Sequence, residues 1–259
     1  MSSMGPGDFT SLAVDYARYR SGYSETLADA LRRFLGRSSE LLDAVDVGAG
    51  TGIWTRMMAD RQCRVVAVEP NDAMREQGRA VAHPGIRWHE GKGEETGLAS
   101  GCAEWVTMAS SFHWTDPARS LPEFARLLRR GGHFTALWNP RDLENNAFHQ
   151  EIESLISSIV PDLKRVSSGS KRFLQDLESK LVSTGHFEDV LYMEARHSVS
   201  MTPERYVGVW RSVNDIQAQA GPERFARILE AIEKKVSGLQ EIVVPYLTRA
   251  WTVRKRTSA

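Results

Sequence analysis

Three glycines at alternate positions, Gly48, Gly50 and Gly52, form the pattern with the clearest chemical meaning in the sequence. They follow a short apolar run with Val45 and Val47, which predicts a buried strand that turns sharply into a helix. Glycine at such a turn permits positive φ angles and lets a ligand lie directly against the backbone. The first N–H groups of the following helix can then point at the ligand. Two classes of nucleotide cofactor are bound by loops of this kind.

The two classes differ in glycine spacing and share an acidic residue further along. The dinucleotide fingerprint G-x-G-x-x-G would require glycine where this chain has Ile53. Residues 64–69 are typical of a second buried strand that ends in a carboxylate. Glu69 follows Gly52 by 17 residues, which is about the distance at which a strand-end acid binds ribose hydroxyls in nucleotide-binding α/β proteins. A strand-end acid can also be merely solvated, but its pairing with the glycine turn favours ribose binding.

Four side chains could act on a substrate or on a bound cation. His113 follows a strand predicted at 104–109, and a histidine pKa near neutrality suits a general base. The same residue could instead have a structural hydrogen-bonding role. Phe112, Trp114 and Tyr16 could hold a cationic group by cation–π attraction, or each could belong to the core.

The composition excludes several other kinds of protein. Lys and Arg together number 33, as do Asp and Glu, so the chain has no excess positive charge to attract nucleic acid. The two cysteines, Cys63 and Cys102, have neither metal-ligand spacing nor a disulfide pattern, which suits a reducing compartment. No apolar run approaches the roughly 20 residues that span a bilayer, and the N-terminus lacks the regions of a signal peptide. We therefore expect a cytoplasmic protein with no metal, nucleic-acid or membrane partner.

Strand and helix patterns alternate through residue 138, and this alternation must position the candidate residues. We predict strands around 45–47 and at 64–69, 86–90, 104–109 and 133–138. We predict helices at 24–35 with Ser24 as N-cap, after the glycine turn, after Asn71 or Asp72, and from a capping box at Ser120 to Gly131. Such alternation indicates a parallel sheet covered by helices on both faces.

The pattern changes after residue 139. Helical stripes are predicted at 148–159, at 173–181, from Thr202 onward and at 225–236, and strands at 187–200 and 242–253. We expect a single domain in three parts: an N-terminal helical arm (1–40), a cofactor-binding core (41–140) and a C-terminal part with a helical lid and the last strands (141–259). In the arm, Tyr16 and Tyr19 would share one helix face, either as core residues or as part of a lid over a ligand.

Five segments occur in an order and spacing typical of one enzyme family. They are 16–23 (Tyr-Ala-Arg-Tyr-Arg-Ser-Gly-Tyr), 45–52 (Val-Asp-Val-Gly-Ala-Gly-Thr-Gly), 67–70 (Ala-Val-Glu-Pro), 111–114 (Ser-Phe-His-Trp) and 127–132 (Leu-Leu-Arg-Arg-Gly-Gly). Together they span roughly residues 9–140. With them the chain resembles the class I S-adenosylmethionine (SAM)-dependent methyltransferases, and among these a small bacterial group that includes ubiquinone-biosynthesis-like and trans-aconitate-like enzymes.

The resemblance implies a fold, a cofactor and a set of site residues. The fold would be α/β and Rossmann-like, with a seven-stranded, mostly parallel sheet, helices on both faces and an antiparallel last strand. The cofactor would be SAM, with S-adenosylhomocysteine as its product. The implied cofactor-binding residues are Asp46, Gly48, Ala49, Gly50, Gly52, Glu69, Pro70, Gly93, Glu94 and Ser110. The implied substrate contacts are Tyr16, Tyr19, Phe112, Trp114, Asn139 and Arg141, with His113 as candidate catalytic base.

The function expected from this resemblance is methyl transfer to an N or O atom of a small-molecule metabolite. Such a reaction is an in-line displacement, in which alignment of the two reactants supplies several kcal/mol. An RNA or protein methyltransferase is an alternative, which the neutral charge and the lack of an added basic domain disfavour. A SAM-binding protein or a cyclase without methyl transfer is a second alternative, favoured by the lack of an unambiguous base.

Overall fold

The computed structural model describes residues 8–36, 40–144, 146–164 and 174–257. Seven strands form one sheet in the order β3-β2-β1-β4-β5-β7-β6. The strands are β1 (Leu42–Val47), β2 (Cys63–Val68), β3 (Ile86–His89), β4 (Ala103–Ala109), β5 (Leu128–Trp138), β6 (Phe187–Met201) and β7 (Ile242–Lys255). The strands from β1 to β5 pair in parallel, whereas β7 pairs antiparallel with both β5 and β6. The predicted seven-stranded sheet with an antiparallel last strand is therefore confirmed.

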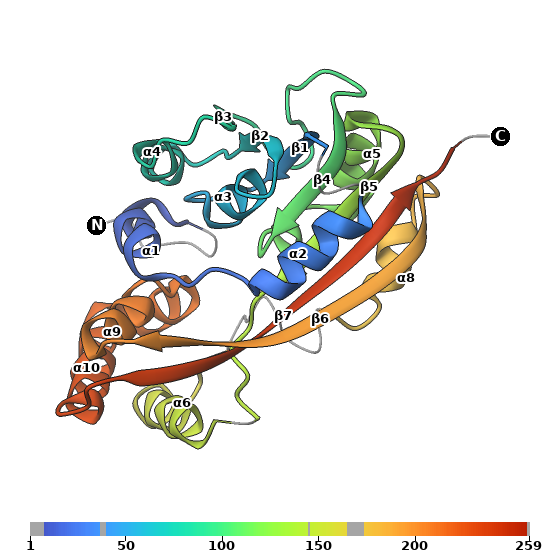
Figure 1. Cartoon of the computed structure of the whole chain (residues 1–259). Helices are drawn as coiled ribbons and strands as arrows, with labels where there is room; N and C mark the ends of the chain where they lie inside the picture. The colour runs from blue at the N-terminus through green and yellow to red at the C-terminus, as the bar shows by residue number, and fades with distance from the viewer. Residues whose placement is uncertain (1–7, 37–39, 145, 165–173, 258–259) are drawn as a thin grey trace.

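Helices cover both faces of this sheet (Figure 1). They are α1 (Ala13–Tyr19), α2 (Glu25–Phe34), α3 (Ile53–Ala59), α4 (Asp72–Ala80), α5 (Pro117–Leu127), α6 (Ala147–Ile159), α8 (Leu177–Val182), α9 (Pro203–Arg211) and α10 (Asn214–Val236). Successive side chains of a strand point to opposite faces. In β5, Phe134 and Ala136 accordingly pack with α5 and α8, while Leu137 packs with α2 and α3.

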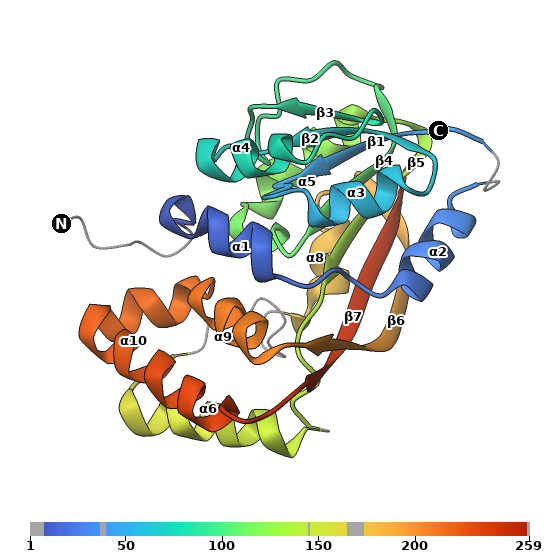
Figure 2. The same cartoon turned by 60° about the vertical axis from the view of Figure 1, so that its left-hand side comes forward.

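A third apolar cluster lies beyond the sheet and joins α6, α9 and α10 to the ends of β6 and β7. Figure 2 shows these three helices together on one side of the molecule, with the two long strands running into them. Ile152, Ile156 and Ile228 are fully buried there, as their helical spacing predicted. Within the region 1–40 that was predicted as a helical arm, we use the name N-terminal arm from here on for residues 8–23 only. This arm packs against the helical layer through Tyr19.

Helix caps decide where several elements begin. The side chains of Ser24, Asn71 and Thr202 accept hydrogen bonds from backbone N–H groups. The predicted N-cap Ser24 is therefore confirmed, Asn71 and not Asp72 caps α4, and the helix predicted from Thr202 begins there. The capping box at Ser120 is wrong, because α5 already begins at Pro117, with Asp116 as its N-cap. Proline is favoured in the first turn of a helix, which has no need of its N–H group.

The boundary between α5 and β5 also differs from the prediction. The helix ends at Leu127, and β5 starts at once with Leu128, so Gly131 and Gly132 lie inside the strand and do not terminate the helix. Gly131 has a φ of 72°, an angle that glycine adopts without strain. Phe173, the first residue of the helical stripe predicted at 173–181, lies outside the described residues, and the helix observed there is α8.

Candidate active site

The glycine loop after β1 has the backbone conformation that the sequence predicted. Gly48, Gly50 and Gly52 have φ angles of 66°, 58° and 78°, which side chains other than glycine rarely adopt. A Cβ atom at Gly48 would also lie 2.7 Å from the Cβ of Ser111, whereas one at Gly50 would meet nothing closer than Met74 Cε at 3.4 Å. The backbone at Gly50 therefore faces open space in which a ligand can approach it.

Glu69 holds the loop from the end of β2. Its carboxylate accepts the backbone N–H of Gly50 at 2.7 Å and that of Asn71 at 2.9 Å. The residue is 7% exposed, and this burial raises its pKa, against the effect of the two hydrogen bonds. Each carboxylate oxygen has a second lone pair, so Glu69 can fix the loop and still accept hydrogen bonds from a ligand.

Asp46 supports the loop from beneath and does not line the cavity described below. It is fully buried and accepts hydrogen bonds from Thr55 Oγ1 at 2.6 Å and Thr107 Oγ1 at 2.9 Å. Burial raises the pKa of Asp46 to about 7, although these two hydrogen bonds oppose the shift. Its position gives it a part in holding β1, α3 and β4 together.

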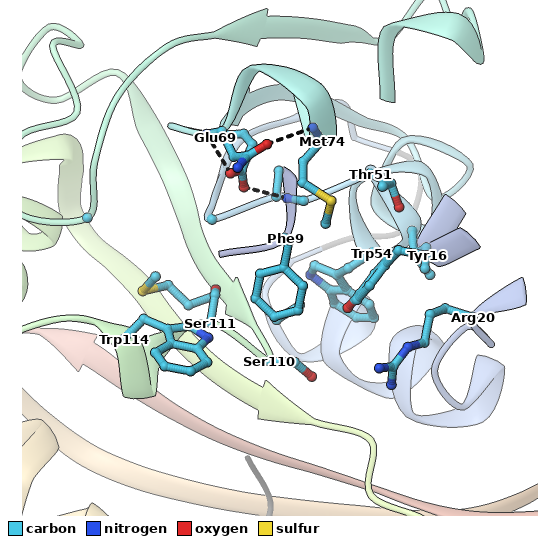
Figure 3. Close-up of a pocket in the computed structure, with 18 of the residues that line it drawn as sticks. Phe9, Tyr16, Arg20, Thr51, Trp54, Glu69, Met74, Ser110, Ser111 and Trp114 are labelled. Carbon is cyan, nitrogen blue, oxygen red and sulfur yellow. Dashed lines mark hydrogen bonds between the residues drawn. The ribbon is translucent and has the colours of Figure 1, made fainter. Parts of the chain in front are cut away.

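A cavity of about 380 Å³ opens at the carboxyl ends of the parallel strands (Figure 3). The wall includes most of the residues that the sequence singled out for cofactor and substrate. These are Gly48, Ala49, Gly50, Glu69, Pro70, Gly93, Glu94, Ser110, Tyr16, Trp114 and Asn139. Open α/β sheets bind ligands at this edge, so the structure brings these residues together where a ligand is expected.

Other candidate residues lie outside the cavity wall. Gly52 and Asp46 belong to the loop and its support. Phe112 is 1% exposed and packs edge-on against Phe134 at 5.4 Å. Tyr19 is buried, and its hydroxyl lies 3.4 Å from Glu204.

His113 and Arg141 are also absent from the wall. Trp138 Nε1 donates a hydrogen bond to His113 Nδ1 at 3.4 Å. Burial lowers the pKa of His113 to about 4, so the side chain is neutral at neutral pH. The guanidinium of Arg141 lies 4.2 Å from the ring centre of Trp210, next to the helical layer.

The sequence did not single out several residues that complete the wall. Phe9, Arg20, Ser21 and Tyr23 come from the N-terminal arm, and further lining residues are Thr51, Ile53, Trp54, Asn71, Met74, Lys92, Met108, Ala109, Ser111, Thr115 and Tyr246. Tyr23 and Ser110 share a hydrogen bond of 3.0 Å between their hydroxyl groups. Ser110 has a φ of 55°, a strained angle for serine. Arg20 and Tyr23 could have been found from the sequence, because they lie in the family-like segment 16–23. Tyr246 could not, because the pattern of the strand predicted at 242–253 does not show which residue faces the cavity.

The wall offers the groups that SAM requires. A carboxylate at Glu69 can accept ribose hydroxyls, the open backbone at Gly50 can contact a polar chain, and Tyr16 and Trp114 present aromatic rings. Thr51 Oγ1 and Trp54 Nε1 in the same wall are buried, with no hydrogen-bond partner among the described residues. The part of the chain that the structure describes contains no group of three or more His, Cys, Asp or Glu side chains placed to bind a metal ion. Within the same residues, no helix has the length and apolarity needed to cross a membrane.

Comparisons with known proteins agree with this geometry. Residues 45–136 match the model of a methyltransferase domain family. An uncharacterised methyltransferase of Mycobacterium bovis is 38% identical over 134 residues, which are 52% of this chain and 53% of the relative. The chain thus spans about half the length of the curated relatives that it matches.

Solved structures match over most of the chain. A putative type II methyltransferase from Anaeromyxobacter dehalogenans has a TM-score of 0.61 at 20% identity, with 91% of this chain and 98% of that chain covered. A putative methyltransferase from an antibiotic biosynthesis pathway of Anabaena variabilis has a TM-score of 0.63 at 19% identity, with 90% and 98% covered. At these identities the likeness concerns the fold. The segment that matches the methyltransferase domain model contains the glycine loop, Glu69 and Ser110, so residues 45–136 resemble a methyltransferase domain in sequence, and the chain has the fold of these solved structures.

Proposed function

We propose that this protein is an enzyme that transfers a methyl group from SAM to an N or O atom of a small-molecule metabolite. The observation that carries the proposal is one cavity whose wall joins the glycine loop and Glu69 to residues from three other parts of the chain. Those residues are Tyr16 of the arm, Asn139 after β5 and Tyr246 of β7. Residues from these three parts could contact a second ligand beside the groups that fit the cofactor.

The covered shape of the cavity favours a small acceptor over RNA or protein. The N-terminal arm forms part of the cavity wall, and its Phe9 ring packs edge-on against Tyr16 at 5.9 Å and Trp114 at 6.4 Å. Asn139 Nδ2 donates to the carbonyl oxygen of Gly22 at 2.9 Å, which ties the end of the arm to the exit of β5. A nucleic acid or a folded protein would have to displace this arm.

Bound SAM supplies an electrophilic methyl group on a positively charged sulfur. The acceptor would have to present a lone pair to that methyl group, and S-adenosylhomocysteine would be the second product. Tyr16 and Trp114 can stabilise the cationic sulfur, an attraction worth about 0.5–2 kcal/mol. His113, the candidate base, does not line the cavity, and its pKa is lowered to about 4 by burial, so this side chain is not expected to take a proton from the acceptor. Alignment of the two ligands by the walls is then the main contribution of this chain.

The test is incubation of the purified protein with methyl-labelled SAM and a metabolite extract. Label in a small product supports the proposal, and label in RNA or protein would replace it with a macromolecular acceptor. Tight binding of S-adenosylhomocysteine without any labelled product would indicate a SAM-binding protein that does not transfer methyl groups. A Gly50→Val variant is the control, because a side chain there would occupy the space next to the loop backbone. Binding of NADH by the wild type would contradict the assignment of SAM as the cofactor.

A further inference from the structure

Strand β6 forms one edge of the sheet and is long for an edge strand. It covers Phe187–Met201, which is 15 residues, whereas strands of globular proteins usually have about 5–6. Within the described residues β6 pairs with β7 alone and stands last in the strand order, and Figure 1 shows it running along β7. Every second residue of an edge strand directs its N–H and C=O groups away from the sheet, so another strand could pair with this edge.

The features that usually prevent such pairing are weak in β6. Natural edge strands avoid pairing by being short, by carrying proline or lysine, by bulges, or by charged side chains that point inwards. Residues 187–201 contain neither proline nor lysine. A bulge occurs at Asp189, which has a φ of 56°, but it lies at one end of the strand and leaves residues 191–201 in regular register with β7.

The two faces of β6 differ in character between residues 191 and 200. The half-buried face carries no Asp, Glu, Lys or Arg, and its residues are Leu191, Met193, Ala195, His197 and Val199. The exposed face consists of Tyr192, Glu194, Arg196, Ser198 and Ser200. A slip by one residue would exchange the two faces, so a second sheet that continues this one must keep its own polar and half-buried faces on the same sides.

The exposed charges of β6 are arranged so that two copies of the strand complement each other. If two copies pair antiparallel about a twofold axis at Ala195, residues at equal distances on either side of Ala195 lie opposite each other. Glu194 of each copy then faces Arg196 of the other. An axis one residue away, through Glu194 or through Arg196, would instead place two like charges opposite each other, which is destabilising.

Within one copy, these two side chains already belong to ion pairs across the same face. Glu194 lies 3.5 Å from Arg249 of β7, and Arg196 lies 3.2 Å from Asp142. The side chains of Glu194 and Arg196 remain 40% and 68% exposed, so each can accept a second partner. Pairing of two copies would join the separate pairs into rows of alternating charge, and such networks stabilise more than isolated surface pairs.

We propose that β6 is an interface through which two copies of this chain pair edge to edge, about a twofold axis at Ala195. On the half-buried face, Leu191 would then lie opposite Val199 of the second copy, so an apolar contact accompanies the charge pairs. The interface is isologous, because the same patch is used by both copies. None of the residues 187–201 lines the cavity, so the inference goes beyond the proposed function and does not depend on it.

Sedimentation velocity with two charge reversals tests this interface. The wild type should sediment as a dimer at a protein concentration of about 100 µM. Glu194→Arg places an arginine opposite Arg196 of the second copy, and Arg196→Glu places a glutamate opposite Glu194 of the second copy. Each change turns two attractive cross-strand pairs into repulsive ones, so each variant alone should dimerise about 10- to 100-fold more weakly than the wild type.

An equimolar mixture of the two variants tests the register. In a mixed dimer the introduced arginine faces the introduced glutamate, and the native Arg196 of one copy faces the native Glu194 of the other. The mixture should therefore dimerise at least about tenfold more tightly than either variant alone. Arg211→Glu is the control, because it reverses a charge on α9 that pairs with Glu233, and it should leave dimerisation unchanged.

A second measurement applies if either variant lacks a cooperative thermal transition. In the wild type, the outward-facing amides of residues 191–199 should then exchange their hydrogens more slowly at about 100 µM than at about 1 µM protein. Exchange that does not depend on concentration would overturn the proposed interface.

Three results of the sedimentation experiment would also overturn the proposal. They are a wild type that stays monomeric, a dimer that neither reversal weakens, and a mixture that dimerises no better than its two components. Failure to bind S-adenosylhomocysteine would instead overturn the proposed function and would leave the result on dimerisation unaffected. The two failures are therefore distinguishable.

Discussion

Replacing Glu69 by glutamine tests whether one carboxylate both fixes the glycine loop and binds the cofactor. The wild-type carboxylate accepts two backbone N–H groups, from Gly50 and Asn71. Glutamine keeps one acceptor oxygen and turns an NH₂ group towards the other backbone donor. One buried N–H is then left unsatisfied, which costs about 1–3 kcal/mol. Glu69→Ala leaves both donors unsatisfied and should cost about twice as much.

These free energies are measurable as thermal shifts. For a chain of this size, a loss of 1 kcal/mol lowers the melting temperature by about 2–4 °C, so Glu69→Gln should melt roughly 2–12 °C below the wild type. Its affinity for S-adenosylhomocysteine should fall about 10- to 100-fold, because a charged acceptor for the ligand is lost as well. Differential scanning calorimetry and titration calorimetry measure the two effects separately.

A matched control and a refuting result complete this experiment. Glu90 follows β3 and pairs with Arg75, and its side chain is 74% exposed. Glu90→Gln should leave the affinity for S-adenosylhomocysteine unchanged and lower the melting temperature by less than about 2 °C. If Glu69→Gln bound S-adenosylhomocysteine within twofold of the wild type, the assignment of Glu69 to the cofactor would be refuted, whatever happened to stability.

Three further predictions concern His113, Asp46 and Gly208. His113→Gln should change kcat less than about threefold and leave the pH profile of kcat unaltered, because the pKa of about 4 keeps the His113 side chain neutral near neutral pH. If the wild-type profile had an inflection near pH 6–7 that the variant lacked, this prediction would be contradicted. The raised pKa of Asp46 means that the folded state holds a proton which the unfolded state releases between pH 4 and 7. Stability should therefore fall as pH rises across that window, and denaturant titrations of Asp46→Asn should give a flatter dependence. A Cβ at Gly208 would lie 2.4 Å from the Tyr19 ring, so Gly208→Ala should reduce the free energy of unfolding by about 1–3 kcal/mol and speed release of S-adenosylhomocysteine. Combining Gly208→Ala with Tyr19→Leu should restore part of the lost stability and slow the release again. An unchanged release rate in Gly208→Ala would show that the arm does not retain the cofactor.

The sequence predicted the parts of the site that depend on local backbone chemistry. The alternating glycines and the acid at the end of β2 identified the loop and Glu69, because positive φ angles and strand ends leave a clear pattern. The antiparallel last strand followed from the family resemblance and not from the pattern of β7 itself. One helix start was predicted wrongly: the capping-box pattern pointed to Ser120, but the helix already begins at Pro117 with Asp116 as its N-cap.

The spacing of residues in the sequence could not predict the direction in which each side chain of the site points. His113 and Trp114 are neighbours in the sequence, yet Trp114 reaches the cavity and His113 contacts Trp138. Within one short helical turn, the burial of Phe112 fixes where its neighbours point. The position of the Arg20 side chain was equally hard to predict, because it is hydrogen-bonded to Ser212, which lies 192 residues away in the chain.

That long separation has a consequence for the order in which the protein assembles. The arm precedes every strand of the sheet in the sequence, yet Arg20 hydrogen-bonds to Ser212, just after α9, and Tyr19 packs against Gly208 of α9. Contacts between segments so distant in sequence form slowly, because a long chain must close before they give any stability. The glycine loop and its neighbouring strands can fold while the rest of the chain is still being synthesised. The cavity is thus closed last, and a nascent chain can hold a formed nucleotide loop long before it has a place for an acceptor.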